Sequence, residues 1–127
     1  MSVAYLDTHV AVALHAGKPG RLSRDARREI DRRDLSLSPM AYVELDNLRR
    51  RGKIRYSAGQ VYEGIKETLG VILCDFPFPE IAMKAIECGW TSDPFDRIIV
   101  AHAWANDESL LITADENIRE HYAQAVW

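Results

Sequence analysis

The sequence predicts an α/β fold in which a central parallel sheet of four to five strands lies between two layers of helices, giving three layers in the order α/β/α. Short apolar segments alternate with longer helical patterns along the whole chain, which is typical of parallel strands joined by crossover helices. There is no internal repeat, and the longest irregular piece is the turn at 17–20. A chain of 127 residues that is 47% hydrophobic can bury one core, so we expect a single domain over 1–127.

The first half of the chain begins with a short apolar run that ends in Asp7 and continues as an apolar helix. Ser38 and Pro39 mark a later helix start, because serine caps helix N-termini and proline fits the first helical position. The elements expected here are a strand at 3–6, helices at 9–16 and 23–33, a strand at 35–37 and a helix at 39–51.

The second half is divided by clear start and stop signals. Ser57 and Gln60 form a capping box, and Asp93 with Pro94 marks the start of a long helix. The elements expected here are a helix at 58–68, a strand at 71–74, a helix from Pro79 to about Gly89, the long helix from 94, a strand at 110–112, a short helix at 115–122 and an edge strand at 125–127.

The composition favours a protein of the cytoplasm. No apolar run reaches the roughly 20 residues of a membrane span, and the N-terminus lacks the pattern of a secretory signal, so we expect no membrane association. The two cysteines, Cys74 and Cys88, lack the spacing of a metal site. In a reducing compartment we expect both to be buried free thiols.

Basic residues are clustered, although the net charge is only −3, which argues against general electrostatic coating of DNA. The simplest interpretation of each cluster is a solvated helix face. Beside an acidic site the same residues are candidates for a phosphate-binding rim. The first cluster consists of Arg24, Arg27, Arg28, Arg32 and Arg33, and the second basic cluster of Arg49, Arg50, Arg51, Lys53 and Arg55.

Acidic residues stand where such a sheet would bring them together. Asp7 and Asp115 each follow a predicted strand within one to three residues. The crevice beyond the carboxyl ends of parallel strands is where ligands bind in this class of fold. We therefore expect a divalent-metal site formed by Asp7, Glu44, Asp96 and Asp115.

Most of these acids also have a simpler explanation as helix caps. Asp7, Asp93 and Asp115 each precede a predicted helix, and aspartate is a preferred cap that stabilises a helix start by ~1 kcal/mol. Thr113 competes with Asp115 for the cap of the last helix. Asp96 would be a favourable charge in a first helical turn.

Glu44 is different, because it lies more than one turn inside its helix and cannot be a cap. On a helical wheel it shares the apolar stripe of Ala41, Leu45 and Leu48, so we expect it to be buried. A buried carboxylate requires a hydrogen bond, a cation or an ion pair. The alternative to a metal site is a buried salt bridge, for example with Arg97.

The donor types favour Mg²⁺ or Mn²⁺ over zinc, because the candidate ligands are carboxylate oxygens and no cysteine or histidine cluster exists. The histidines are scattered along the chain. His102 shares a helix face with Phe95, Ile98 and Ile99, which indicates a core histidine. His9 is the histidine closest to the predicted site.

Four segments together resemble the PIN-domain ribonucleases, and in particular the VapC-type toxins of type II toxin–antitoxin systems. The segments are YLDTHVAVAL, SPMAYVELDNL, DPFDRIIVAHAWA and LLITADENI, and they cover nearly the full chain in order. The resemblance implies a PIN-like α/β/α domain that cleaves single-stranded RNA with Mg²⁺ or Mn²⁺ and inhibits translation. It also implies a homodimer that is held inactive by a cognate antitoxin.

The resemblance places the acidic quartet of the family on Asp7, Glu44, Asp96 and Asp115. Asp93 matches a further frequent acid, and Thr8 and Thr113 match accessory polar positions. In the mechanism that we expect, Asp7, Asp96 and Asp115 bind the metal and Glu44 orients or deprotonates the attacking water. The second basic cluster would bind RNA phosphates, and Tyr42, Tyr56 and Trp90 are candidates for stacking on bases.

Two alternatives remain open on the sequence. A phosphatase on a similar doubly wound sheet also uses a strand-end aspartate, but its pattern places a second aspartate where this chain has His9. A non-catalytic module that binds RNA or an antitoxin would use the acids only as caps, and the position of Glu44 argues against it.

Overall fold

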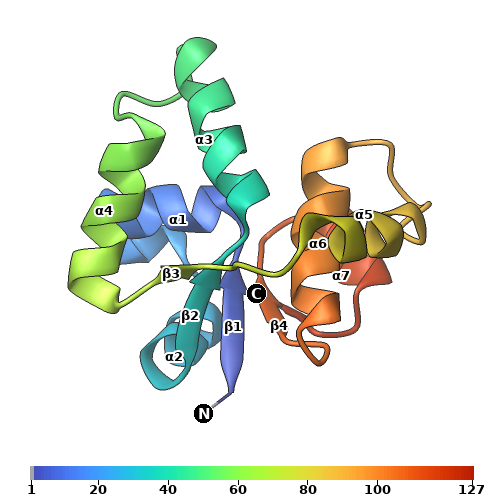
Figure 1. The fold of residues 1–127 in the computed structure, drawn as a ribbon. Coiled ribbons are helices and arrows are strands. Elements are labelled where there is room, and N and C mark those ends of the chain that lie inside the picture. The colour runs from blue at the N-terminus through green and yellow to red at the C-terminus, as the bar shows by residue number, and fades with distance from the viewer. Residues whose placement is uncertain (1) are drawn as a thin grey trace.

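The structure, a computed structural model that describes residues 2–127, is built around one parallel sheet. In this part of the chain five strands pair in the order β3-β2-β1-β4-β5, so β1 lies at the centre (Figure 1). This confirms the predicted fold class. The strands are β1 (Val3–Leu6), β2 (Asp34–Leu37), β3 (Ile72–Leu73), β4 (Leu110–Ile112) and β5 (Ala125–Val126).

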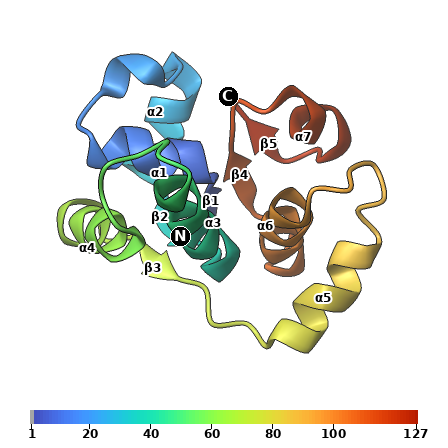
Figure 2. The same cartoon turned by 90° about the horizontal axis from the view of Figure 1, so that it is seen from above.

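Helices cover both faces of the sheet. Figure 2 shows α1 and α2 on one side and α5 and α6 on the other, while α3 rises above the carboxyl edge of the strands in Figure 1. The helices are α1 (Thr8–His15), α2 (Arg24–Arg32), α3 (Pro39–Arg50), α4 (Ala58–Leu69), α5 (Phe78–Ile86), α6 (Pro94–Ala105) and α7 (Glu116–His121), with a short 3₁₀ helix η1 (Pro19–Arg21). Within residues 2–127 no helix is both long and apolar enough to cross a membrane.

Several expected boundaries differ from the observed ones by a residue or more, and the differences at β3, α5 and β5 have a visible cause. Strand β3 spans two residues instead of four, although the amide of Cys74 still donates to the Leu37 carbonyl of β2 at 2.9 Å. Helix α5 ends at Ile86 rather than near Gly89, because the amides of Glu87 and Cys88 turn back to carbonyls of the last helical turn. Strand β5 ends at Val126, and Trp127 leaves the sheet.

The core confirms the expectations for the buried polar residues. His102 is 2% exposed, and its Nδ1 lies 2.9 Å from the hydroxyl of Ser38, the residue that caps α3. Burial lowers the pKa of His102, so its neutral form is favoured in this position. Cys74 and Cys88 are buried and free, as the sequence predicts.

Helix α1 packs against α4 at a glycine, and this contact gives a first prediction. A Cβ atom added at Gly64 would lie 2.7 Å from Cδ2 of His15, whose ring is also held edge-on against Tyr56 at 5.0 Å. We expect Gly64→Ala to lower the free energy of unfolding by about 1–2 kcal/mol in urea titrations, since the imidazole has little room to move.

Gly59 in the same helix provides the matched control. A Cβ atom there would lie 3.4 Å from the Tyr42 hydroxyl, so Gly59→Ala is expected to leave the stability within about 0.5 kcal/mol of the wild-type value. His15→Ala should restore stability to the Gly64→Ala protein. Equal stabilities for the two glycine variants would contradict the close packing of α1 on α4.

Candidate active site

One cavity of about 530 Å³ lies at the carboxyl edge of the sheet and gathers acidic residues from four segments of the chain. Strands β1 and β4 are neighbours in the sheet, so the residues that follow them emerge side by side. The acidic residues that line the cavity are Asp7, Glu44, Asp93, Asp96 and Asp115. The structure thus brings together all four members of the predicted quartet and the accessory acid.

Asp7 is the most deeply buried of these carboxylates, with 8% of its surface exposed. One of its oxygens accepts from the amide of Thr8 at 2.8 Å and caps α1, and the other accepts from the hydroxyl of Thr113 at 2.5 Å. Burial raises the pKa of Asp7, and the two hydrogen bonds oppose that rise. Both accessory threonines of the prediction therefore contact Asp7 directly.

Glu44 points from α3 toward α1, where the hydroxyl of Thr8 donates a hydrogen bond to its Oε1. Glu44 was expected on the buried stripe of its helix, and it is half-buried there and lines the cavity. The alternative salt bridge is absent from the described residues; Arg97 instead donates through Nε to the Ala85 carbonyl at 3.1 Å. Partial burial and the nearby charge of Asp7 raise the pKa of Glu44.

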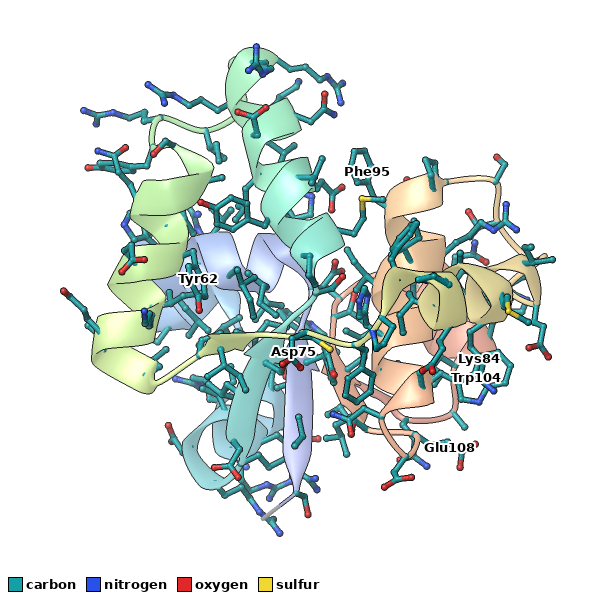
Figure 3. The ribbon with its side chains drawn as sticks, in the orientation of Figure 1. Tyr62, Asp75, Lys84, Phe95, Trp104 and Glu108 are labelled. Carbon is teal, nitrogen blue, oxygen red and sulfur yellow. The ribbon has the colours of Figure 1, made fainter. Side chains whose placement is uncertain are left out.

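The start of α6 carries two more acids of the cavity. Asp93 caps the helix by accepting from the amides of Phe95 at 2.8 Å and Asp96 at 3.3 Å. Asp96 is half-buried, and burial together with the negative charges of its acidic neighbours raises its pKa to about 7. Figure 3 shows Phe95 at this helix start, on the side that faces α3.

Asp115 is exposed and caps α7 by accepting from the amide of Ile118 at 3.0 Å. Its own amide donates to the hydroxyl of Thr113 at 3.1 Å. The Thr113 hydroxyl therefore links the ends of β1 and β4, since it accepts from the amide of Asp115 and donates to Asp7. Capping a helix and lining the cavity are not exclusive, because Asp7, Asp93 and Asp115 do both.

The donor set of the cavity fits a hard divalent cation such as Mg²⁺ or Mn²⁺, because it consists of carboxylate oxygens. Burial and, after it, repulsion from the neighbouring carboxylates raise the pKa of Asp96, and a bound cation would relieve the repulsion. In residues 2–127, however, no three acidic, histidine or cysteine side chains are already close enough to enclose one ion. Asp7 and Glu44 contact threonine hydroxyls instead, so ion binding requires the carboxylates to draw closer together.

The basic residues are arranged differently from the expected rim. The second basic cluster lies at the far end of α3 and in the turn that follows, and none of its residues lines the cavity. In the first cluster, Arg28 and Arg32 are exposed and pair with Asp25 and Glu29, which is typical of a solvated helix face. Arg33 also pairs with Glu29, but both of these side chains are mostly buried. His9 lines the cavity, as expected, and so does Arg21, which no feature of the sequence marks as a site residue.

The expected stacking residues also have ring partners within the protein. Tyr42 packs edge-on against Tyr62 at 5.9 Å, Tyr56 against His15, and Trp90 stacks on His121 at 5.1 Å. The aromatic residue that lines the cavity is Trp127. Neither Arg21 nor Trp127 carries a local sequence signal, because each reaches the cavity only through the tertiary fold.

Three solved structures have a similar fold. VapBC2 from Rickettsia felis, bound to a DNA fragment from the VapBC2 promoter, matches with a TM-score of 0.60 and 15% sequence identity. VapBC-1 from nontypeable Haemophilus influenzae matches with a TM-score of 0.62 and 19% identity. DNA-bound VapBC from Salmonella typhimurium matches with a TM-score of 0.54 and 17% identity. Each match covers 98% of this chain and 96% of the matched chain. At these identities the likeness establishes the fold.

No curated protein matches the sequence significantly. The PIN domain family does match, over residues 4–124, which is nearly the whole chain and contains every acid of the cavity. On this evidence the chain belongs to the PIN domain family.

Proposed function

We propose that this protein is a Mg²⁺- or Mn²⁺-dependent endoribonuclease that acts as the toxin of a toxin–antitoxin pair, hydrolysing single-stranded RNA and inhibiting translation in the cytoplasm. PIN domains are typically nucleases, which favours this activity over a phosphatase on a similar sheet. The observation that carries the proposal is the cavity in which carboxylates from β1, α3, α6 and the end of β4 meet. A capping role alone gives no reason for this convergence.

Asp7, Asp96 and Asp115 would hold the divalent ion, and Asp93 would add negative charge beside them. The ion would supply the positive charge that stabilises phosphodiester hydrolysis and favours ionisation of water. Thr113 fixes the orientation of Asp7, and Thr8 fixes that of Glu44. Glu44 would accept a proton from the attacking water, a role that suits a carboxylate whose pKa is raised by partial burial.

The second basic cluster is proposed to bind phosphates of the RNA away from the cleaved bond. Its five members are exposed on or beyond the end of the helix that carries Glu44. Contacts of this kind give affinity without reading sequence. Arg50 already pairs with Asp46 at 2.6 Å, so its contribution requires that this exposed ion pair opens.

The proposed partners are a cognate antitoxin and a second copy of the chain. The structural neighbours are described as VapBC assemblies, and their likeness to this chain supports an antitoxin partner here. The homodimer follows from the resemblance of the sequence to VapC-type toxins.

The proposed activity is tested by incubating the full chain with single-stranded RNA oligonucleotides in Mg²⁺, Mn²⁺ or excess EDTA. We expect internal cleavage with either metal and none in EDTA. Asp96→Asn should abolish cleavage in the presence of metal. Glu67→Gln, which changes an exposed acid of α4 that does not line the cavity, should cleave like the wild type.

Cleavage that survives both EDTA and Asp96→Asn would overturn the metal-dependent mechanism. RNA binding without cleavage under every metal condition would favour the alternative of a non-catalytic RNA-binding module.

A further inference from the structure

The cavity is larger than a metal site requires, and part of its wall is not acidic. Its volume of about 530 Å³ lies in the range of sites that enclose part of an organic ligand, whereas a water molecule occupies only about 30 Å³. Among the residues of this second wall are Arg21 from η1 and Trp127 from the end of β5. Figure 2 shows the C-terminus of the chain between α2 and α7, beside the carboxyl edge of the sheet.

Arg21 presents a free cation from a fixed backbone. Its amide donates to the Lys18 carbonyl at 3.1 Å, and the next residue, Leu22, is buried and donates to the Pro19 carbonyl at 3.0 Å. The side chain of Arg21 is exposed, and none of the ion pairs within residues 2–127 includes it. A guanidinium in this state is available to a phosphate, which it can hold with two parallel hydrogen bonds.

Trp127 presents an aromatic ring from the opposite end of the sequence. The carbonyl of Val126 accepts from the amide of Thr113 at 3.1 Å, so the backbone just before Trp127 is fastened beside the residue that orients Asp7. The indole is half-buried and packs against the main core while it lines the cavity. An aromatic ring that packs against the core on one side and lines a cavity on the other can stack on a nucleic-acid base.

The negative charge of the cavity explains why both Arg21 and Trp127 are needed to bind RNA. The acidic wall repels the phosphates of RNA, so the chain must supply attraction elsewhere until the divalent ion neutralises the carboxylates. Arg21 supplies positive charge and Trp127 supplies stacking energy that is insensitive to charge. A phosphate and a base are two of the three parts of a nucleotide, and single-stranded RNA offers a phosphate together with an unpaired base.

We infer that Arg21 and Trp127 form a nucleotide-binding subsite next to the cleaved bond, in which Arg21 holds a neighbouring phosphate and Trp127 stacks on an unpaired base. The inference rests on the proposed ribonuclease function and adds which two residues would bind the nucleotide beside the cleaved bond. The base that stacks on Trp127 would be splayed away from its neighbours, so a duplex at that position would be excluded from the site.

The test measures KM and kcat separately for Arg21→Gln and Trp127→Leu with a single-stranded RNA oligonucleotide and Mg²⁺. Both variants are expected to raise KM about tenfold and to leave kcat within about twofold of wild type, since a lost stacking or charged contact weakens binding by about that factor. Arg21→Gln should also lower the slope of log affinity against log salt by about 0.7, the contribution of one phosphate contact on a single strand.

A second measurement reports binding without cleavage. RNA in which 2-aminopurine replaces each base in turn is titrated into the Asp96→Asn protein, and one position is expected to lose fluorescence through stacking. Trp127→Leu should abolish that quenching, and Trp127→Phe should retain most of it.

The controls are an arginine and a tryptophan outside the cavity. Arg119→Gln changes an exposed arginine of α7, and Trp104→Leu changes an indole that lies under the Lys84 ammonium at 4.2 Å (Figure 3). Both should keep the wild-type KM and quenching. Circular dichroism and thermal unfolding establish that each variant is folded.

The outcomes separate this subsite from the proposed activity. Wild-type KM and quenching in both Arg21→Gln and Trp127→Leu would overturn the subsite, even if the protein is a metal-dependent ribonuclease. Quenching that depends on Arg21 and Trp127 in a protein that never cuts would sustain the subsite and overturn the proposed activity. A protein that neither binds nor cuts single-stranded RNA would overturn both.

Discussion

Asp7→Asn is expected to lower the rate of RNA cleavage about a thousandfold while the protein stays folded. The carboxylate is central to the cavity and would bind the divalent ion directly. Asparagine keeps the size of the side chain and one oxygen that can cap α1, but it removes the negative charge. The change therefore separates the chemical role of Asp7 from its structural role.

Stability and activity should move in opposite directions in this variant. Burial raises the pKa of Asp7, which means that the ionised form is disfavoured in the folded protein. Removing the charge should leave the melting temperature unchanged or raise it at pH 8 without metal. If Asp7 were only a helix cap, cleavage would persist, because asparagine is as good a cap as aspartate.

The measurement compares initial cleavage rates of the wild type, Asp7→Asn and Glu67→Gln at saturating Mg²⁺, together with their thermal unfolding. A loss of less than about tenfold in Asp7→Asn would contradict a metal-binding role. A parallel loss of stability and activity would instead indicate that the site had lost its fold.

The stability of the metal-free protein is expected to fall by about 1–2 kcal/mol as the pH rises from about 4 to about 8. The pKa of Asp96 is about 7 in the folded protein and near its ordinary value of 3.8 in the unfolded chain. Between these values the folded state binds a proton that the unfolded state does not. The contribution of this proton to stability is complete below the unfolded pKa and is lost as the pH rises through the folded pKa.

Urea titrations in EDTA at several pH values measure this dependence. Asp96→Asn should remove the larger part of the pH dependence and be more stable than the wild type at pH 8. Glu67→Gln should keep the pH dependence of the wild type. At pH 8, Mg²⁺ at a hundred times its Kd should stabilise the wild type by about 3 kcal/mol and have a much smaller effect on Asp96→Asn. A flat profile for the wild type would contradict the raised pKa of Asp96, which burial and the neighbouring negative charges produce together.

The parts of the site that follow from the sequence are those fixed by local rules. Asp7 and Asp115 each stand between the end of a strand and the start of a helix. This position puts both at the carboxyl edge of the sheet, however the helices pack. The helical wheel places Glu44 on the buried side of its helix, whereas the structure leaves it half-buried at the cavity. A helical wheel predicts which way a side chain points, but it does not predict how much solvent-filled space lies in front of it.

The parts that the sequence does not predict depend on tertiary neighbours. Arg21 directly follows the turn at 17–20, and only the packing of η1 beside α1 brings it to the cavity. Trp127 was assigned to an edge strand, because an apolar residue at the end of an apolar run has no local feature that marks a bend. The second basic cluster is close to Glu44 in the sequence, but none of its residues lines the cavity. Closeness in sequence therefore did not predict closeness in space.

The double use of the aspartates as caps and as cavity residues has a consequence at the level of the gene. An aspartate codon becomes an asparagine codon by a single base transition, and asparagine caps a helix as well as aspartate does. At positions 7, 93 and 115 this change would remove a charge and preserve the fold. If the chain acts as the proposed toxin, selection against its activity would have a short mutational path to inactive alleles whose products still fold.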